Sequence, residues 1–286
     1  MDEILKNWHL SDAEIELIYE SKDNKTWVIS DKYYLKFYGN IQELDVAVRV
    51  NTVLSNHGIP VVTYKKTENG EITPDRHHVL MHKIKGEHLT FESIMLDEMK
   101  NLGRGVATLH QGFSQLEKEL VCPDNDYLAE WNGYIKSGLI DVRDEIVTYI
   151  DEQLHKHYND LPRNIIHRDI HLGNVLIDAG VITGWLDFDL TRKDIRIFDI
   201  AYLMTGLLLG RIDDKFAILK WQDLLQNFIA GYESVANLEE NEHLLLPVMM
   251  IAMELLFVTY WGSLDNDAEV KKANALAEWL YDAYVG

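Results

Sequence analysis

The sequence predicts an α+β fold with two lobes: a small antiparallel β-sheet that carries one helix, followed by a larger, mostly helical part. Two observations favour this prediction. Runs rich in β-branched and aromatic residues dominate the chain up to about residue 83, whereas segments with helical periodicity fill most of the remainder. A length of 286 residues also accommodates two separate cores. We therefore expect lobes at 1–83 and 84–286.

The first lobe is expected to contain a helix at 41–56 and four strands, at 26–29, 33–38, 59–64 and 78–82. The polar turn Ser30-Asp31-Lys32 separates the first two runs, and His57-Gly58 ends the helix. Residues 83–88 contain Gly86 and are the expected link between the lobes.

The second lobe is expected to be largely helical, with helices at 91–111, 140–158, 197–210, 214–236, 239–264 and 267–284. Strand-like runs remain at 164–167, 175–177 and 181–187. The last two should pair across Asp178-Ala179-Gly180 as a hairpin. Residues 244–264 are apolar enough to imitate a membrane span, but Pro247, Glu254 and the lack of flanking positive charge favour a buried helix.

The composition restricts the partners. The chain carries a net charge of −20, which repels nucleic acid and anionic membrane surfaces. The same charge would attract a cationic small molecule, although a solubilising surface is the plainer interpretation. Cys122 is the only cysteine, and the start of the chain lacks the features of a signal peptide, so we expect a cytoplasmic protein. A monomer and a homodimer both remain open.

The most informative motif is His167-Arg168-Asp169-Ile170-His171-Leu172-Gly173-Asn174, followed by Asp187 in Trp185-Leu186-Asp187-Phe188-Asp189. Phosphoryl transfer needs a group that positions a hydroxyl and oxygen ligands for a metal ion. We assign Asp169 as the group that orients the hydroxyl and accepts its proton. The oxygens of Asn174 and Asp187 are hard donors of the kind that Mg²⁺ prefers. The role of Asp189 is left open.

The same segment has a second interpretation. His167, Asp169 and His171 form a His-x-Asp-x-His pattern, which is also typical of metal ligands in hydrolases.

Taken together, these motifs resemble the aminoglycoside phosphotransferase and choline kinase family, most strongly over 165–204 and more weakly over 33–60 and 102–110. The resemblance implies a protein-kinase-like fold, ATP or GTP as donor, Mg²⁺, and a small-molecule hydroxyl as acceptor. Acceptors in such a family include amino sugar antibiotics, choline-like amines, sugars such as methylthioribose, and homoserine. It further implies that 1–83 covers the nucleotide and that 84–286 carries the catalytic loop and acceptor-binding helices.

The resemblance also assigns roles in the second lobe. His167 would brace the catalytic loop through hydrogen bonds, and His171 would either brace it or approach the transferred phosphate. Asp199, in Arg196-Ile197-Phe198-Asp199, would cap a helix and support the loop. His110 matches the end of a helix that precedes the substrate region.

In the first lobe, the resemblance makes Lys36 the lysine that contacts the α and β phosphates. An exposed strand lysine is the alternative when Lys36 is considered alone. Residues 81–84, among them Met81 and Lys83, would present the backbone groups that read the nucleotide base, unless they simply end a buried strand.

Two departures from the family pattern stand out. The helix glutamate that pairs with the lysine would fall near Ala47, so we predict Glu43 as its substitute, with Asp45 as a weaker one. The turn over the phosphates, residues 20–25, contains no glycine. Ser21 and Asn24 are its candidate phosphate-binding residues.

Two other functions compete with a small-molecule kinase. A binding protein of kinase fold without turnover would explain the missing helix glutamate. A protein kinase would need a long segment after Asp187, whereas only residues 188–197 precede the next predicted helix. Acidic and aromatic residues of the second lobe are candidates to hold a cationic acceptor, namely Asp213, Asp214, Glu233, Glu254, Asp265, Asp267, Trp221, Tyr260 and Trp261.

Overall fold

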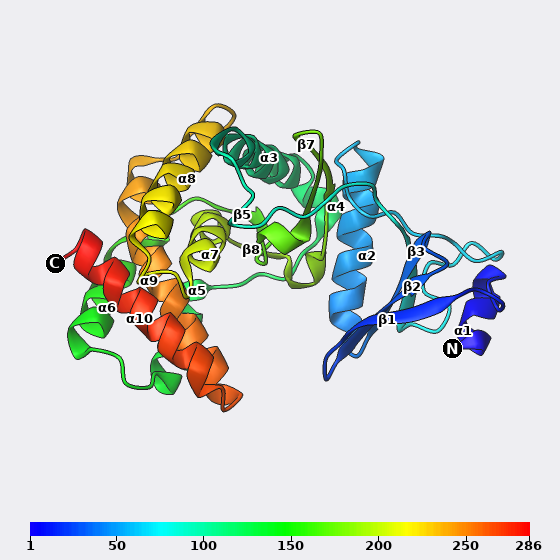
Figure 1. Ribbon diagram of the computed structural model, residues 1–286, viewed down its shortest axis with the longest axis horizontal. Helices are drawn as coiled ribbons and strands as arrows, with labels where there is room; N and C mark the ends of the chain where they lie inside the picture. The colour runs from blue at the N-terminus through cyan, green and yellow to red at the C-terminus, as the bar shows by residue number, and fades with distance from the viewer. The chain divides into compact units, whose positions relative to one another are not determined.

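A computed structural model describes residues 1–286 (Figure 1). The chain forms two compact units, each made of two segments: the first unit comprises 1–88 and 173–190, and the second comprises 89–172 and 191–286. Residues 173–190, which the sequence assigned to the second lobe, therefore belong with the N-terminal sheet. The reason is backbone pairing, because Glu87 and Ile177 exchange amide hydrogen bonds of 2.9 and 3.0 Å.

The first unit contains a four-stranded antiparallel sheet in the order β1-β2-β3-β4. Its elements are α1 (Asp2–Leu5), η1 (Lys6–Trp8), β1 (Ile15–Glu20), β2 (Asn24–Ile29), β3 (Tyr33–Tyr38), α2 (Ile41–Asn56), β4 (His78–His82), β6 (Val175–Asp178), β7 (Val181–Trp185) and η6 (Phe188–Leu190). The side chain of Asn40 caps α2 by accepting from the Gln42 amide at 3.0 Å. Gly58, with φ of +77°, follows its end.

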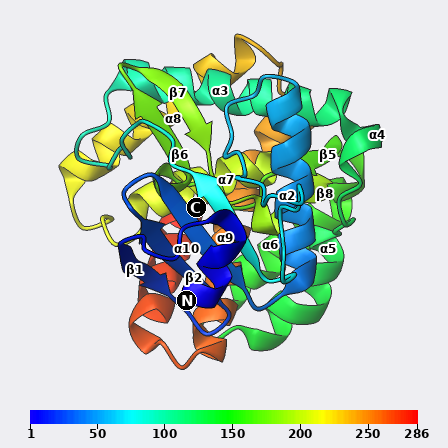
Figure 2. The ribbon, with the colours of Figure 1, turned by 90° about the vertical axis from the view of Figure 1, so that its right-hand side faces the viewer.

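The predicted hairpin of β6 and β7 is confirmed (Figure 2). Ala179 and Gly180 both have positive φ, 50° and 78°, which suits a tight turn between antiparallel strands. The strand predicted at 59–64 is wrong. Residues 59–64 make only isolated bridges, Val61 to Trp185 and Tyr64 to Met81, because they pair with two different strands in turn.

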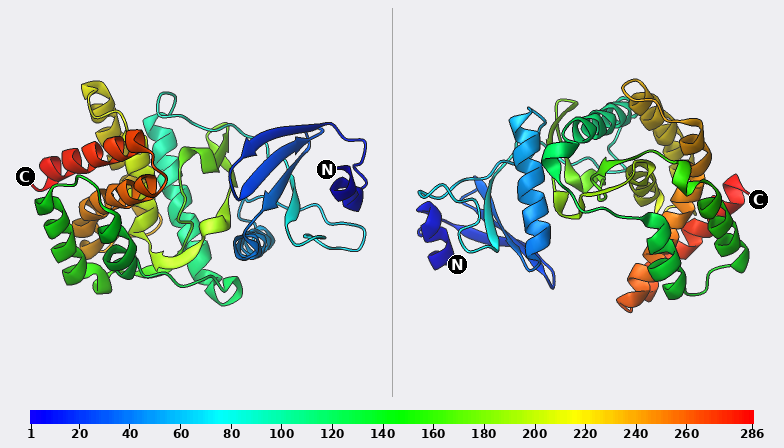
Figure 3. Two further views of the ribbon diagram at one scale, coloured as in Figure 1. Left: turned by 90° about the horizontal axis from the view of Figure 1, so that it is seen from below. Right: turned by 180° about the vertical axis from the view of Figure 1, so that it is seen from behind.

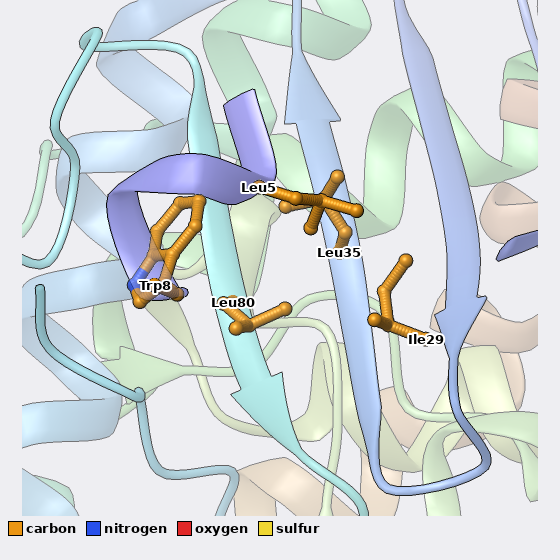
Figure 4. Close-up of a cluster of buried hydrophobic side chains, with 5 residues drawn as sticks. All are labelled: Leu5, Trp8, Ile29, Leu35 and Leu80. Carbon is orange, nitrogen blue, oxygen red and sulfur yellow. The ribbon is translucent and has the colours of Figure 1, made fainter. Parts of the chain in front are cut away.

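One face of the sheet is covered by the N-terminal segment. Leu5 and Trp8 pack against Ile29, Leu35 and Leu80, all of them 3% exposed or less (Figure 4). This apolar cluster joins β2, β3 and β4, so it stabilises the strand that carries Lys36.

The second unit is mostly helical. Its elements are α3 (Leu96–Gln115), α4 (Glu117–Leu120), α5 (Tyr127–Glu130), η2 (Trp131–Ile135), η3 (Lys136–Gly138), α6 (Asp144–His157), η4 (Tyr158–Asp160), β5 (Arg163–Ile166), β8 (Arg192–Ile195), α7 (Ile197–Leu208), α8 (Lys215–Glu233), α9 (Glu240–Ser263) and α10 (Asp267–Tyr284). Strands β5 and β8 pair antiparallel, and β8 was not expected. The short helix η5 (Leu172–Asn174) spans the junction of the units.

Helix α3 begins later than predicted. Thr90 and Ser93 bond to each other's amides through their hydroxyls, at 3.0 and 3.2 Å. These local side-chain bonds compete with helical backbone bonds, so the residues before Leu96 form a turn.

Helix α9 is the buried helix that was expected at 239–264. It is the one helix long and apolar enough to span a membrane by composition, but 67% of its most apolar window is buried inside the structure. It packs along α10 (Figure 3). Glu254 of α9 is 1% exposed, so it does not form part of a surface that attracts cations.

Helices α3 and α8 approach closely through glycines, and a methyl group there should be destabilising. A Cβ at Gly103 would lie 2.1 Å from the Phe228 carbonyl oxygen, so Gly103→Ala should lower the free energy of unfolding by about 1–3 kcal/mol. The exposed Gly206 of α7 has nothing within 4 Å, so Gly206→Ala should raise it by up to about 1 kcal/mol. Chemical denaturation measures both. If the two substitutions changed the free energy of unfolding equally, the close packing at Gly103 would be contradicted.

Glu254 should make stability depend on pH. Its burial raises its pKa from 4.5 to about 8, while Thr205 offsets part of the shift. Between these pH values the unfolded chain loses the proton and the native protein retains it, so stability should fall as pH rises. Glu254→Gln should then be more stable than the parent at pH 8.5 and similar at pH 4.5, since each pKa unit corresponds to about 1.4 kcal/mol. Thermal melting at both pH values tests this; a pH-independent difference would contradict it.

Candidate functional site

A cavity of about 420 Å³ lies within the first unit. Residues assigned from the sequence that line it are Lys36, Met81, Lys83, Asn174 and Asp187. The rest of the lining is mostly apolar and aromatic. The cavity thus combines a few convergent polar groups with apolar walls, which is typical of a small-molecule site.

Lys36 is the charged centre of this cavity. It lies on β3, between Thr26 of β2 and Val79 of β4, and is 8% exposed. Its ammonium donates to Asp187 Oδ1 and Asp189 Oδ2, both at 2.7 Å. Burial alone would lower the pKa of Lys36, but the charges of the two aspartates outweigh it and the pKa is raised. Lys36 therefore stays protonated.

The local backbone explains how two aspartates reach one lysine. In an extended segment, Asp189 would point to the side opposite Asp187. Asp187 instead has φ of +62°, and η6 begins at the next residue. This turn brings both carboxylates to Lys36. Because side-chain alternation does not hold across a left-handed residue, Asp189 could not be recognised from the sequence as a partner of Lys36.

Asp189 is fixed more firmly than Asp187. Its Oδ1 accepts from the Tyr38 hydroxyl at 2.9 Å, and the residue is 7% exposed. Burial raises the pKa of Asp189 to about 7, with Lys36 opposing the shift and Asp187 adding to it. Burial and the charge of Asp189 raise the pKa of Tyr38, so its phenol stays neutral and donates. The Asp187 side chain, in contrast, is 39% exposed.

The predicted pairing of Glu43 with Lys36 is wrong. Glu43 is only partly exposed on α2, and its carboxylate accepts from the Asn40 side chain at 2.9 Å. The two partners of Lys36 come instead from the segment after β7. Asp45, the weaker substitute, is exposed.

Ser21 and Asn24 do not line the cavity. Instead, they bond to each other within the turn between β1 and β2. The Ser21 hydroxyl accepts from the Asn24 amide at 3.0 Å, and the Ser21 amide donates to the Asn24 carbonyl at 2.8 Å. Lys83 lines the cavity, but its ammonium is paired with Asp31.

In the second unit, Asp199 organises the segment that carries Asp169. Fully buried on α7, it accepts from the backbone amides of His167 at 2.9 Å and Arg168 at 2.7 Å. It also lies 3.0 Å from His110 Nε2. The expected support of the loop is thus present. The expected helix cap is not, because the residue at the N-cap of α7 is Arg196.

Asp169 has a partner that sequence analysis missed. The Tyr202 hydroxyl donates to Asp169 Oδ1 at 2.6 Å, and Tyr202 lies three residues after Asp199 on the same face of α7. The Asp169 amide donates to His167 Nδ1 at 3.3 Å, and His171 Nε2 lies 3.9 Å from Asp169 Oδ2. Of these contacts, the hydrogen bond from Tyr202 orients the carboxylate. The helical spacing from Asp199 could have identified Tyr202.

The geometry does not favour the metal-hydrolase interpretation. The structure contains no group of three His, Cys, Asp or Glu side chains placed to hold a metal ion. His167, Asp169 and His171 therefore do not form such a group. Asn174 and Asp187, by contrast, offer oxygen donors at one cavity. Two such donors fit a cation that arrives with most of its ligands supplied by a bound anion.

Comparison with known proteins places these features in a family. The sequence is 30% identical over 166 residues to a homoserine kinase of Phenylobacterium zucineum, an alignment that covers 55% of this chain and 49% of that protein. The chain thus spans about half the length of this relative.

Solved structures share the fold. An amicoumacin kinase in complex with AMP-PNP, Ca²⁺ and Ami superposes with a TM-score of 0.75 at 17% identity, covering 99% of this chain and 93% of that one. A microcompartment-associated aminopropanol kinase gives 0.73 at 19% identity, covering 99% and 97%. These similarities confirm the predicted α+β, kinase-like fold. Since the family model of the phosphotransferase enzymes matches residues 14–240, the chain belongs to the phosphotransferase enzyme family.

Proposed function

We propose that the protein is an ATP-dependent kinase that transfers the γ-phosphate to a hydroxyl group of a small molecule. The observation that supports this most is the convergence of Lys36, Asn174 and Asp187 on one cavity, in a chain of the phosphotransferase family. That residues 1–83 cover the nucleotide and that 84–286 carry the catalytic loop and the acceptor-binding helices is part of the proposal, as is action in the cytoplasm.

The first unit would bind the nucleotide. Lys36 would neutralise the α and β phosphates, and the backbone at Met81 would meet the base against the apolar walls of the cavity. Asn174 and Asp187 would hold Mg²⁺ through hard oxygen donors. A bound Mg²⁺ would neutralise part of the negative charge of the phosphates.

The segment around Asp169 would act on the acceptor. Its carboxylate would orient the acceptor hydroxyl and accept its proton. The hydroxyl oxygen would form the new bond to the γ-phosphorus while the bond from that phosphorus to the β,γ-bridging oxygen breaks and ADP leaves. The hydrogen bond from Tyr202 holds one carboxylate oxygen in place at 2.6 Å. His167, bonded to the Asp169 amide, is a positioning residue in this scheme. His171, at 3.9 Å from Asp169 and 45% exposed at its side chain, would meet the transferred phosphate.

The acceptor we favour is a small amine that carries a hydroxyl. The similar proteins include kinases named for homoserine and aminopropanol, both of which combine these two groups. The net charge of −20 suits a cationic acceptor and opposes nucleic acid as a partner.

A screen of acceptor-dependent ADP release tests the function. Homoserine, aminopropanol, choline, an aminoglycoside and a sugar would each be offered with Mg-ATP. We expect release with an amino-alcohol. Asp169→Asn should bind Mg-ATP as the parent does but lose turnover by about 10²-fold or more, because the base is gone. Asp223→Asn, on the exposed face of α8, is the matched control and should be fully active.

Two outcomes would contradict the proposal. Unchanged turnover of Asp169→Asn would remove this residue from the mechanism. Tight binding of Mg-ATP without release for any acceptor would instead favour a kinase-fold binding protein.

A further inference from the structure

The ion pair that positions the lysine in the family pattern has no equivalent on α2. Ala47 occupies the expected place, is 1% exposed, and packs against Tyr38, Leu44 and Val79. Glu43 bonds to Asn40 instead. A buried ammonium without a carboxylate partner is costly, so another residue has to hold Lys36.

Asp189 has the properties that such a partner needs. One of its oxygens lies 2.7 Å from the Lys36 ammonium, and the other accepts from Tyr38 at 2.9 Å. The Lys36 ammonium also lies 4.5 Å from the centre of the Tyr38 ring. All three residues are 8% exposed or less, and all line the same cavity. A carboxylate that is engaged through both oxygens has little freedom to turn away.

Asp187 is less suited to a permanent role. It is the second partner of Lys36 and also the candidate metal ligand, and its side chain is 39% exposed. A cation that arrived with the nucleotide would compete with Lys36 for this carboxylate. If Lys36 depended on Asp187 alone, metal binding would leave a buried ammonium unpaired.

We propose that Asp189, oriented by Tyr38, replaces the helix glutamate as the lasting partner of Lys36. It is a positioning residue that keeps Lys36 directed at the phosphates while Asp187 exchanges Lys36 for the cation. This inference rests on the proposed nucleotide-binding function. It predicts that the side chains of Asp189 and Lys36 act as a unit in nucleotide binding.

A double-mutant cycle on the binding of Mg-AMP-PNP tests this directly, with no acceptor required. Asp189→Asn and Lys36→Met should each raise the dissociation constant about tenfold, and the double variant should bind no more weakly than the weaker single variant. Glu43→Gln is the matched control on α2 and should leave binding unchanged. Independent, multiplicative losses in the double variant would overturn the pairing, as would a loss for Glu43→Gln that equals that of Asp189→Asn.

The dependence on Mg²⁺ separates positioning from a merely structural role. In Asp189→Asn, Lys36 has Asp187 as its only remaining carboxylate partner, so more Mg²⁺ should be needed to reach half-maximal AMP-PNP binding. An unchanged Mg²⁺ requirement would contradict the exchange. Should Asp189→Asn fail to fold, Tyr38→Phe takes its place in the cycle, because it retains both charges and removes only the hydroxyl; additivity with Lys36→Met would again overturn the inference.

The two proposals fail in different ways. A parent protein that binds no Mg-AMP-PNP removes the kinase function itself. A parent protein that binds it, with an additive cycle, removes only the role of Asp189.

Discussion

The cavity of the first unit depends on neutralising one buried ammonium. Lys36 lies on β3, an inner strand of the sheet, and is only 8% exposed, so its ammonium has little contact with water. Its charge is acceptable there because Asp187 and Asp189 both reach it at 2.7 Å. The pairing ties β3 to the segment after β7, which are far apart in the sequence. It therefore both completes the first unit and sets the charge of the cavity.

In the second unit, the buried carboxylate of Asp199 holds a backbone segment in place. Asp199 accepts the amides of His167 and Arg168 and contacts His110, so it determines the path of the chain just before Asp169. Arg168 has φ of +71°, a conformation that needs such support. Tyr202, on the next turn of α7, then fixes the carboxylate of Asp169. One helix thus positions both the backbone before Asp169 and the carboxylate of Asp169.

The sequence predicted the fold and the main polar residues, because strand alternation, helical periodicity and the spacing of Asp169, Asn174 and Asp187 are local signals. It failed where the outcome depends on tertiary contacts. The partner of Lys36 was assigned to Glu43 by helix position, whereas a left-handed turn at Asp187 brings in Asp189. Ser21 and Asn24 were judged by residue type, but the Ser21 hydroxyl bonds to the Asn24 backbone within their turn, and neither residue lines the cavity. Likewise, the sequence of residues 59–64 does not indicate that they pair with two different strands in turn.

The pairing of Lys36 is the claim on which the site depends, and a crystal structure with Mn²⁺ and AMP-PNP would test it most directly. The anomalous signal of Mn²⁺ locates the cation, and the refined side chains show which carboxylate holds the lysine. We expect Asp187 and Asn174 to contact the cation while the Lys36 ammonium keeps Asp189 within hydrogen-bonding distance, about 3 Å. A Lys36 that leaves Asp189 and pairs with Glu43 of α2 would contradict the account.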